Sequence, residues 1–183
     1  MELKLNYTIE TMVKNNKLNK IILNNQYFYF LGQKVNFNYE ANAQKLILLY
    51  DDKKFEFFQE NPNKTINNIY KWFIQQTNLI FEDFCQYMCN KSKIESISFK
   101  LNCAKTYWGS YQKNKKLITI NIFAFQFPKS IIEYLFNHEF SHIQHQNHSS
   151  DFYNCLSLLE PTHKLKSKIL KTKIAPYNLL FKW

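Results

Sequence analysis

Residues 137–148 read Asn-His-Glu-Phe-Ser-His-Ile-Gln-His-Gln-Asn-His, and they contain the motif H-E-x-x-H followed six residues later by another histidine. On an α-helix, His138 and His142 project from one face, one turn apart. That spacing suits two ligands of one zinc ion, with Glu139 as the general base. Four of the five histidines of the chain fall within these residues, and a single buried core histidine would not explain so many. The stretch therefore predicts a metal site.

The third ligand predicted from this stretch is His148. If the helix ran straight on, His148 would lie about 15 Å along the axis from His138, out of reach of a shared metal. The chain must therefore leave the helix after His142 and fold back. We expect the break at Gln146 and Asn147, because Asn tolerates a left-handed conformation. The offsets match the metzincin pattern, but His145 stands at the position of its glycine, which indicates a different bend.

Other side chains near the motif offer alternative ligands. His145 is predicted to lie beside the site or on the surface, because catalytic zinc takes three protein ligands and leaves one position for water. Glu160, eighteen residues after His142, is a lesser alternative third ligand of the gluzincin kind. A fourth ligand such as His145, Asp151 or His163 would instead indicate a closed, structural zinc site.

The length of the chain and its cysteine pattern limit the kind of protein that it can be. A chain of 183 residues forms one domain, or one domain with a small appendage. It has no apolar run of eighteen residues, and residues 1–6 lack the apolar core of a signal peptide. The four cysteines form no C-x-x-C pair. These features predict a cytoplasmic protein with reduced cysteines and no membrane partner.

The charge of the chain is strongly positive. The formal net charge is +10, and every cation is a lysine. Arginine is the usual residue for bidentate recognition of phosphate and guanine, so its absence argues against base-specific reading of DNA. The lysines still permit weak, salt-sensitive association with nucleic acid.

Hydrophobic patterning divides the chain into a β-rich first part, residues 1–60, and a second part, residues 61–183. Strands are predicted at residues 3–9, 21–23, 27–30, 35–39, 46–50 and 55–58. A helical period begins at Thr65 and lasts about six turns. Strands follow at 94–101 and 117–123, and the second is predicted to be an edge that could pair with an extended peptide. Gly109, one of two glycines, predicts positive φ or close approach to a ligand.

Helices are predicted for the last third of the chain. Ser130 and Glu133 form an S-x-x-E capping box, so the metal helix should start at Ser130. A second helix, capped by Ser149 or Ser150, should end near residue 159. A third spans 164–173 with Leu165, Ile169 and Leu170 on its buried side, and residues 175–183 form a hydrophobic tail.

Several short motifs resemble the YgjP-like zinc metallopeptidases, bacterial relatives of the WSS and SprT-type proteases. They are Trp108-Gly109-Ser110, Ile120-Asn121, Pro128, Ile132-Glu133-Tyr134, the histidine stretch and Phe152. Tyr111 stands where the family usually has cysteine. The resemblance implies an α+β fold with a minimal zincin-like core: an N-terminal meander, a long helix, a small sheet, the H-E-x-x-H helix and C-terminal helices. It also implies zinc on His138, His142 and His148, with Glu139 as catalytic base.

The function predicted from these observations is zinc-dependent hydrolysis of peptide bonds in a peptide or protein substrate. Zinc lowers the pKa of bound water, and Glu139 takes its proton. Trp108, Ser110 and Asn121 are predicted to contact the substrate. One alternative is a metal-dependent UTP pyrophosphohydrolase, an activity assigned to YgjP relatives. Another is a DNA-associated or adaptor protein with structural zinc.

Overall fold

The computed structural model describes residues 23–61, 64–104 and 106–171. Its first sheet is an antiparallel meander of four strands in the order β1-β2-β3-β4. These strands are β1 (Tyr27–Phe30), β2 (Gln33–Glu40), β3 (Lys45–Tyr50) and β4 (Lys53–Phe58). They confirm the four strands predicted after residue 26. The strand predicted at residues 3–9 lies outside the described residues. Of the strand predicted at residues 21–23 only Leu23 is described, and it is helical, so the prediction is wrong at that residue.

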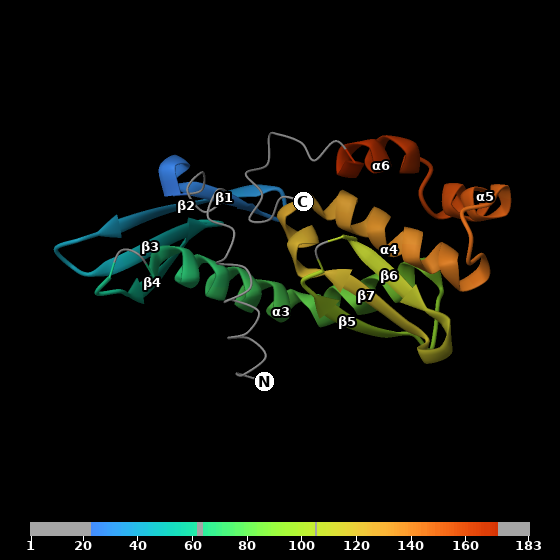
Figure 1. Cartoon of the computed structure of the whole chain (residues 1–183), viewed down its shortest axis with the longest axis horizontal. Helices are drawn as coiled ribbons and strands as arrows, with labels where there is room; N and C mark the ends of the chain where they lie inside the picture. The colour runs from blue at the N-terminus through green and yellow to red at the C-terminus, as the bar shows by residue number, and fades with distance from the viewer. Residues whose placement is uncertain (1–22, 62–63, 105, 172–183) are drawn as a thin grey trace.

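The long helix α3 (Thr65–Ser92) joins the two halves of the described chain, passing from the first sheet to the second (Figure 1). Its apolar face is buried, as the helical period predicts. Trp72 is fully buried, and its ring lies 5.4–5.7 Å from four rings of the meander. Those four rings belong to Phe28, Phe30, Tyr50 and Phe55. Aromatic packing of this kind fixes α3 on the meander.

The second sheet has three strands, β5 (Ser98–Asn102), β6 (Gly109–Gln112) and β7 (Leu117–Asn121), in the order β5-β7-β6. β7 pairs in parallel with β5 and antiparallel with β6. The prediction that residues 117–123 form an edge strand is therefore wrong, because β7 lies in the centre and β6 at one edge. The strand also ends earlier than predicted, and a buried 3₁₀ helix, η3 (Ile122–Gln126), follows it.

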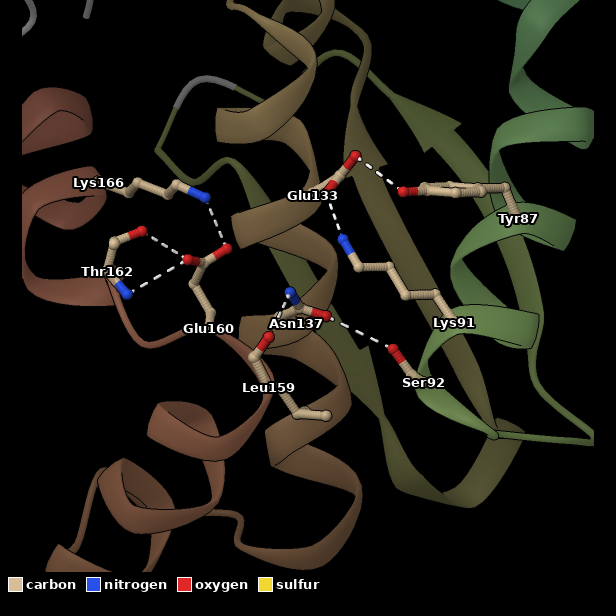
Figure 2. A network of polar contacts seen from close by, with 9 residues as sticks. All are labelled: Tyr87, Lys91, Ser92, Glu133, Asn137, Leu159, Glu160, Thr162 and Lys166. Atoms are coloured by element: carbon tan, nitrogen blue, oxygen red, sulfur yellow. Dashed lines mark hydrogen bonds and ion pairs between the residues drawn. The ribbon is translucent and has the colours of Figure 1, made fainter.

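The metal helix α4 (Lys129–Gln144) packs along the second sheet (Figure 1). Pro128 occupies its N-cap, and no side chain caps it, so the predicted capping box is wrong. Glu133 instead binds Lys91 and Tyr87 of α3 (Figure 2). This contact ties the first turn and a half of α4 to the end of α3.

Two helices follow α4. In α5 (Ser150–Leu159), the Ser149 side chain accepts a hydrogen bond from the Phe152 amide, which confirms one of the two predicted caps. α6 (His163–Lys171) confirms the third helix as far as the structure describes it. Leu165 was predicted to be buried but is 62% exposed, whereas Leu170 is buried. The predicted tail at 175–183 lies outside the described residues.

These elements confirm the α+β class, with its meander, long helix, small sheet, metal helix and C-terminal helices. One buried cluster contains side chains from the meander, α3, η3, α4 and α5. The domain boundary at residue 60 remains a prediction. No helix within the described ranges has the length and apolar character needed to cross a lipid bilayer.

Candidate metal centre

Three imidazoles converge beside α4. His138 and His142 come from its last two turns, and His148 comes from the chain that returns after it. One ring nitrogen from each of the three lies within 4.8 Å of the others, and the Nε2 atoms of His138 and His148 are 3.1 Å apart. With zinc–nitrogen bonds of about 2.0–2.1 Å, two ligands of one tetrahedral zinc lie about 3.3 Å apart. The three nitrogens therefore fit a single zinc-sized ion.

The return of the chain starts with extended backbone at His145. α4 ends at Gln144, and His145 follows with φ −126° and ψ 104°. Of the residues described between Lys116 and Lys171, none has a positive φ. The chain bends at Gln146 and Asn147, where the break was predicted, but the left-handed conformation predicted there is wrong. Because an extended residue needs no special side chain, this bend does not require the glycine of the metzincin pattern.

The backbone of His145 orients the His142 imidazole. The His142 Nδ1 atom lies 3.1 Å from the carbonyl oxygen of His145, so the proton on Nδ1 is donated there and Nε2 is left for a metal. The His145 side chain is partly buried and does not belong to the donor cluster. His145 thus contributes its carbonyl rather than its imidazole.

Phe152 forms the floor under the three imidazoles. Its ring centroid lies 5.0, 4.6 and 4.7 Å from those of His138, His142 and His148, and the side chain is fully buried. It comes from the first turn of α5, directly after the Ser149 cap. Sequence reasoning included Phe152 in the family pattern but missed this contact. An aromatic residue four positions after the third histidine was the available signal.

Burial keeps His138 in its neutral, metal-binding form. Burial first, and then the positive charge that His142, His148, His163 and Lys171 can carry, lower the pKa of His138 to about 3. The Nδ1 atom of His138 is also buried without a hydrogen-bond partner in the part of the chain that the structure describes.

Glu139 lies next to this cluster with its carboxylate almost sealed from solvent. It is 4% exposed, and burial raises its pKa to about 8. Its Oε2 atom has no hydrogen-bond partner among the described residues. A Cβ atom at Gly109 would lie only 2.6 Å from Glu139 Oε1. Gly109 thus meets the predicted need for a close approach, and the group it approaches is the Glu139 carboxylate.

Of the three residues predicted to contact the substrate, two line hollows beside the histidines and one is buried. Trp108 and Gly109 line a cavity of about 660 Å³ together with His138, Glu139 and His148. Ser110 lines an adjoining hollow of about 440 Å³ that also reaches His142. The structure therefore brings Trp108 and Ser110 to the metal cluster.

Asn121 is fully buried instead. Its Nδ2 donates to the carbonyl oxygens of Ala104 and Tyr107 at 2.7 and 3.1 Å, and its Oδ1 accepts from the Phe123 amide at 3.0 Å. These bonds fix the segment that precedes Trp108. The side chain of Asn121 holds the wall of the cavity in place and does not face it.

The side chains considered as alternative ligands, Glu160 and His163, contact other residues. Glu160 accepts hydrogen bonds from Thr162 and Lys166 (Figure 2). Burial alone would raise the pKa of Glu160, but these bonds and the charge of Lys166 lower it. His163 lies 3.1 Å from the Ser157 hydroxyl. Neither of these two, nor Asp151, belongs to the metal-ligating group found in the described ranges.

Comparisons with known proteins identify the family. The model of the YgjP-like metallopeptidase domain matches residues 4–173. Among solved structures, the chain is similar to the zymogen of abylysin from Pyrococcus abyssi, with 17% identity and a TM-score of 0.46. It is also similar to the zymogen of jannalysin from Methanocaldococcus jannaschii, with 22% identity and a TM-score of 0.44. Each similarity covers 51% of this chain, and 93% and 96% of those chains respectively. No curated protein matches the chain. The match over most of its length shows that the chain belongs to the YgjP-like metallopeptidase family and is a metal-dependent peptidase.

Proposed function

We propose that this protein is a zinc peptidase in which His138, His142 and His148 hold the ion and Glu139 is the general base. The observation that carries the proposal is the convergence of three imidazole nitrogens beside a buried carboxylate. A donor set of three histidines is typical of catalytic zinc, which keeps one position open.

A zinc ion held there would lower the pKa of a water molecule and polarise the scissile carbonyl group. Glu139 accepts the proton of the attacking water through Oε2, which has no hydrogen-bond partner in the described part of the chain, and then donates it to the leaving amine. The His145 carbonyl keeps the His142 imidazole in one orientation. Phe152 packs against all three rings and excludes water from beneath them.

The neighbouring sheet supports a peptide as the substrate. β6 lies at the edge of its sheet, and Gly109 and Ser110 line the two hollows beside the metal ligands. An extended peptide could add to this edge by main-chain hydrogen bonds, which places a scissile bond near the metal. Trp108 would contact the substrate from the wall of the larger cavity, and Asn121 would act as a positioning residue behind it.

The Glu139→Gln variant tests the proposal. The amide is nearly the same size as the carboxylate but cannot act as a base, so kcat/KM on a casein or peptide substrate should fall about 10²- to 10⁴-fold. One zinc ion per chain should remain by metal analysis. Glu133→Gln, on the same helix but bonded to α3, is the matched control and should keep its activity. Full activity in Glu139→Gln would refute the role of Glu139.

The two alternatives gain no comparable support. Among the described residues that line the larger cavity, Glu139 is the one carboxylate, whereas magnesium sites in phosphoryl-transfer enzymes use carboxylates together with substrate phosphates. Incubation with UTP and with casein, each with and without chelator, separates nucleotide hydrolysis from peptide hydrolysis. A structural zinc would require a fourth protein ligand, and the metal cluster found in the described ranges has three.

A further inference from the structure

The larger cavity beside the metal ligands has two chemically different walls. One wall consists of His138, Glu139 and His148, which belong to the proposed reaction centre. The opposite wall comes from α6, which lies above α4 in Figure 1. The volume of about 660 Å³ is within the range of ligand pockets, roughly 300–1,000 Å³. The α6 wall can therefore contact a substrate residue next to the scissile bond.

The α6 wall is basic. Lys164, Ser167 and Lys171 line the cavity, and their spacing of three and then four residues places them on one helical face. Leu170 is buried from the same helix and anchors it to the core. Lys171 lines the same cavity as His138 and His148. One face of α6 thus contributes two exposed lysines to the lining of the cavity.

These two lysines lack acidic partners among the residues that the structure describes. The four ion pairs found there use Lys45, Lys54, Lys91 and Lys166. Lys166, which does not line the cavity, binds Glu160. Glu139 is the one carboxylate among the described lining residues, and its place is beside the metal ligands. The cavity therefore has an uncompensated positive charge on the wall opposite the reaction centre, which attracts anionic groups.

We propose that this cavity binds a carboxylate of the peptide substrate and that Lys164 and Lys171 determine this specificity. The proposal rests on the peptidase function proposed above and extends it to a substrate class, peptides with a negative charge near the scissile bond. The carboxylate could belong to an acidic side chain or to the C-terminus of the peptide.

The first test measures hydrolysis. Quenched fluorogenic peptides of one sequence carry Glu, Gln or Lys at each position within three residues of the scissile bond, with either a free or an amidated C-terminus. At the position that enters the cavity, kcat/KM should favour Glu over Gln by about tenfold, and high salt should reduce this ratio. If the free C-terminus is the ligand, the tenfold difference should appear between acid and amide instead. Equal rates for all these peptides would overturn the proposal.

Variants of α6 identify the residues responsible. In the Lys164→Gln/Lys171→Gln double variant, the preference for the carboxylate should fall to near one, and in Lys171→Glu the lysine peptide should become the preferred one. Lys168→Gln is the matched control, because Lys168 is on the same helix but does not line the cavity. A preference that survives the double variant, or one that Lys168→Gln removes, would overturn the assignment.

A binding measurement separates this proposal from the proposed reaction. Zinc-loaded Glu139→Gln protein is titrated into labelled Glu, Gln and amidated peptides, and fluorescence anisotropy gives the affinities. Tighter binding of the carboxylate peptide, lost in the α6 double variant, supports the cavity assignment even if wild-type protein hydrolyses no peptide. In that case the proposed peptidase reaction fails and the binding site stands. Equal affinities would overturn the cavity assignment whether or not hydrolysis occurs.

Discussion

Replacement of Gly109 by alanine should impair catalysis without unfolding the protein. The added Cβ would lie 2.6 Å from Glu139 Oε1 and 3.0 Å from its Cδ, whereas ordinary contacts begin near 3.4 Å. The backbone at Gly109 is not in the left-handed region, so alanine introduces no backbone strain there. The conflict must be relieved by the carboxylate, which has to move by about 0.8 Å, the difference between 3.4 and 2.6 Å.

A displacement of that size has a large effect on a proton transfer. A misplacement of about 1 Å can reduce a rate about 10²-fold, so kcat/KM of Gly109→Ala should fall by roughly that factor. The carboxylate is at the end of a flexible side chain and borders two hollows, so it can yield at a cost of about 1 kcal/mol or less in the free energy of unfolding.

The assay compares three quantities in wild type, Gly109→Ala and a control on the same strand, Gln112→Ala, whose side chain is exposed. They are kcat/KM on one peptide, zinc per chain, and the midpoint of urea unfolding. We expect Gly109→Ala to lose activity while it keeps its zinc and nearly keeps its midpoint. Wild-type activity, or a variant that fails to fold, would refute the reasoning, because either result means that the carboxylate is not the group that moves.

Three further predictions concern the ligands and their support. Phe152→Ala should lower the free energy of unfolding by about 3–5 kcal/mol in urea denaturation, because it empties a fully buried site under three imidazoles. His148→Ala should lower zinc affinity more than about 100-fold in a chelator competition, yet leave the thermal midpoint of the metal-free protein unchanged, since His148 is exposed. The pKa of Glu160 is lower in the folded protein than in the unfolded chain, so its bond to Lys166 stabilises the protein above about pH 4.3, the pKa of an unfolded glutamate. This stabilisation is lost as the pH falls through the pKa that Glu160 has in the folded protein. By thermal melts, Glu160→Gln should therefore be about 1 kcal/mol less stable than wild type at pH 7, and the difference should shrink as the pH falls below about 4.3.

The helices and the metal cluster could be predicted because their signals are local. The apolar period of α3, the i, i+4 pair His138 and His142, and the Ser149 cap each depend on residues within a few positions of one another. The need for a return to His148 follows from helical rise alone. These features require no knowledge of distant partners.

Strand order and the capping box could not be predicted for the opposite reason. β7 is central because β5 pairs with it in parallel on one side and β6 pairs with it on the other. Parallel pairing joins strands that are distant in the chain, so no short sequence motif predicts it. The motif Ser130–Glu133 is compatible with a cap, but Pro128 already occupies the N-cap. Glu133 therefore lies inside the helix, where Lys91 and Tyr87 of α3 are within reach. In both cases a contact from far along the chain decided the outcome.

The bend at His145 shows why residue type alone misleads at this site. A glycine signals a bend only when the backbone must be left-handed, and here the backbone is extended, so any residue could form it. What the site uses at this position is the carbonyl oxygen, which every residue has and which binds His142 Nδ1. The imidazole of His145 is therefore unconstrained by this bond, although it lies between two ligands in the sequence. A sequence pattern contains information about side chains only. When a residue acts through its backbone, as His145 does, its type does not indicate that role, and the role can be found only from the path of the chain.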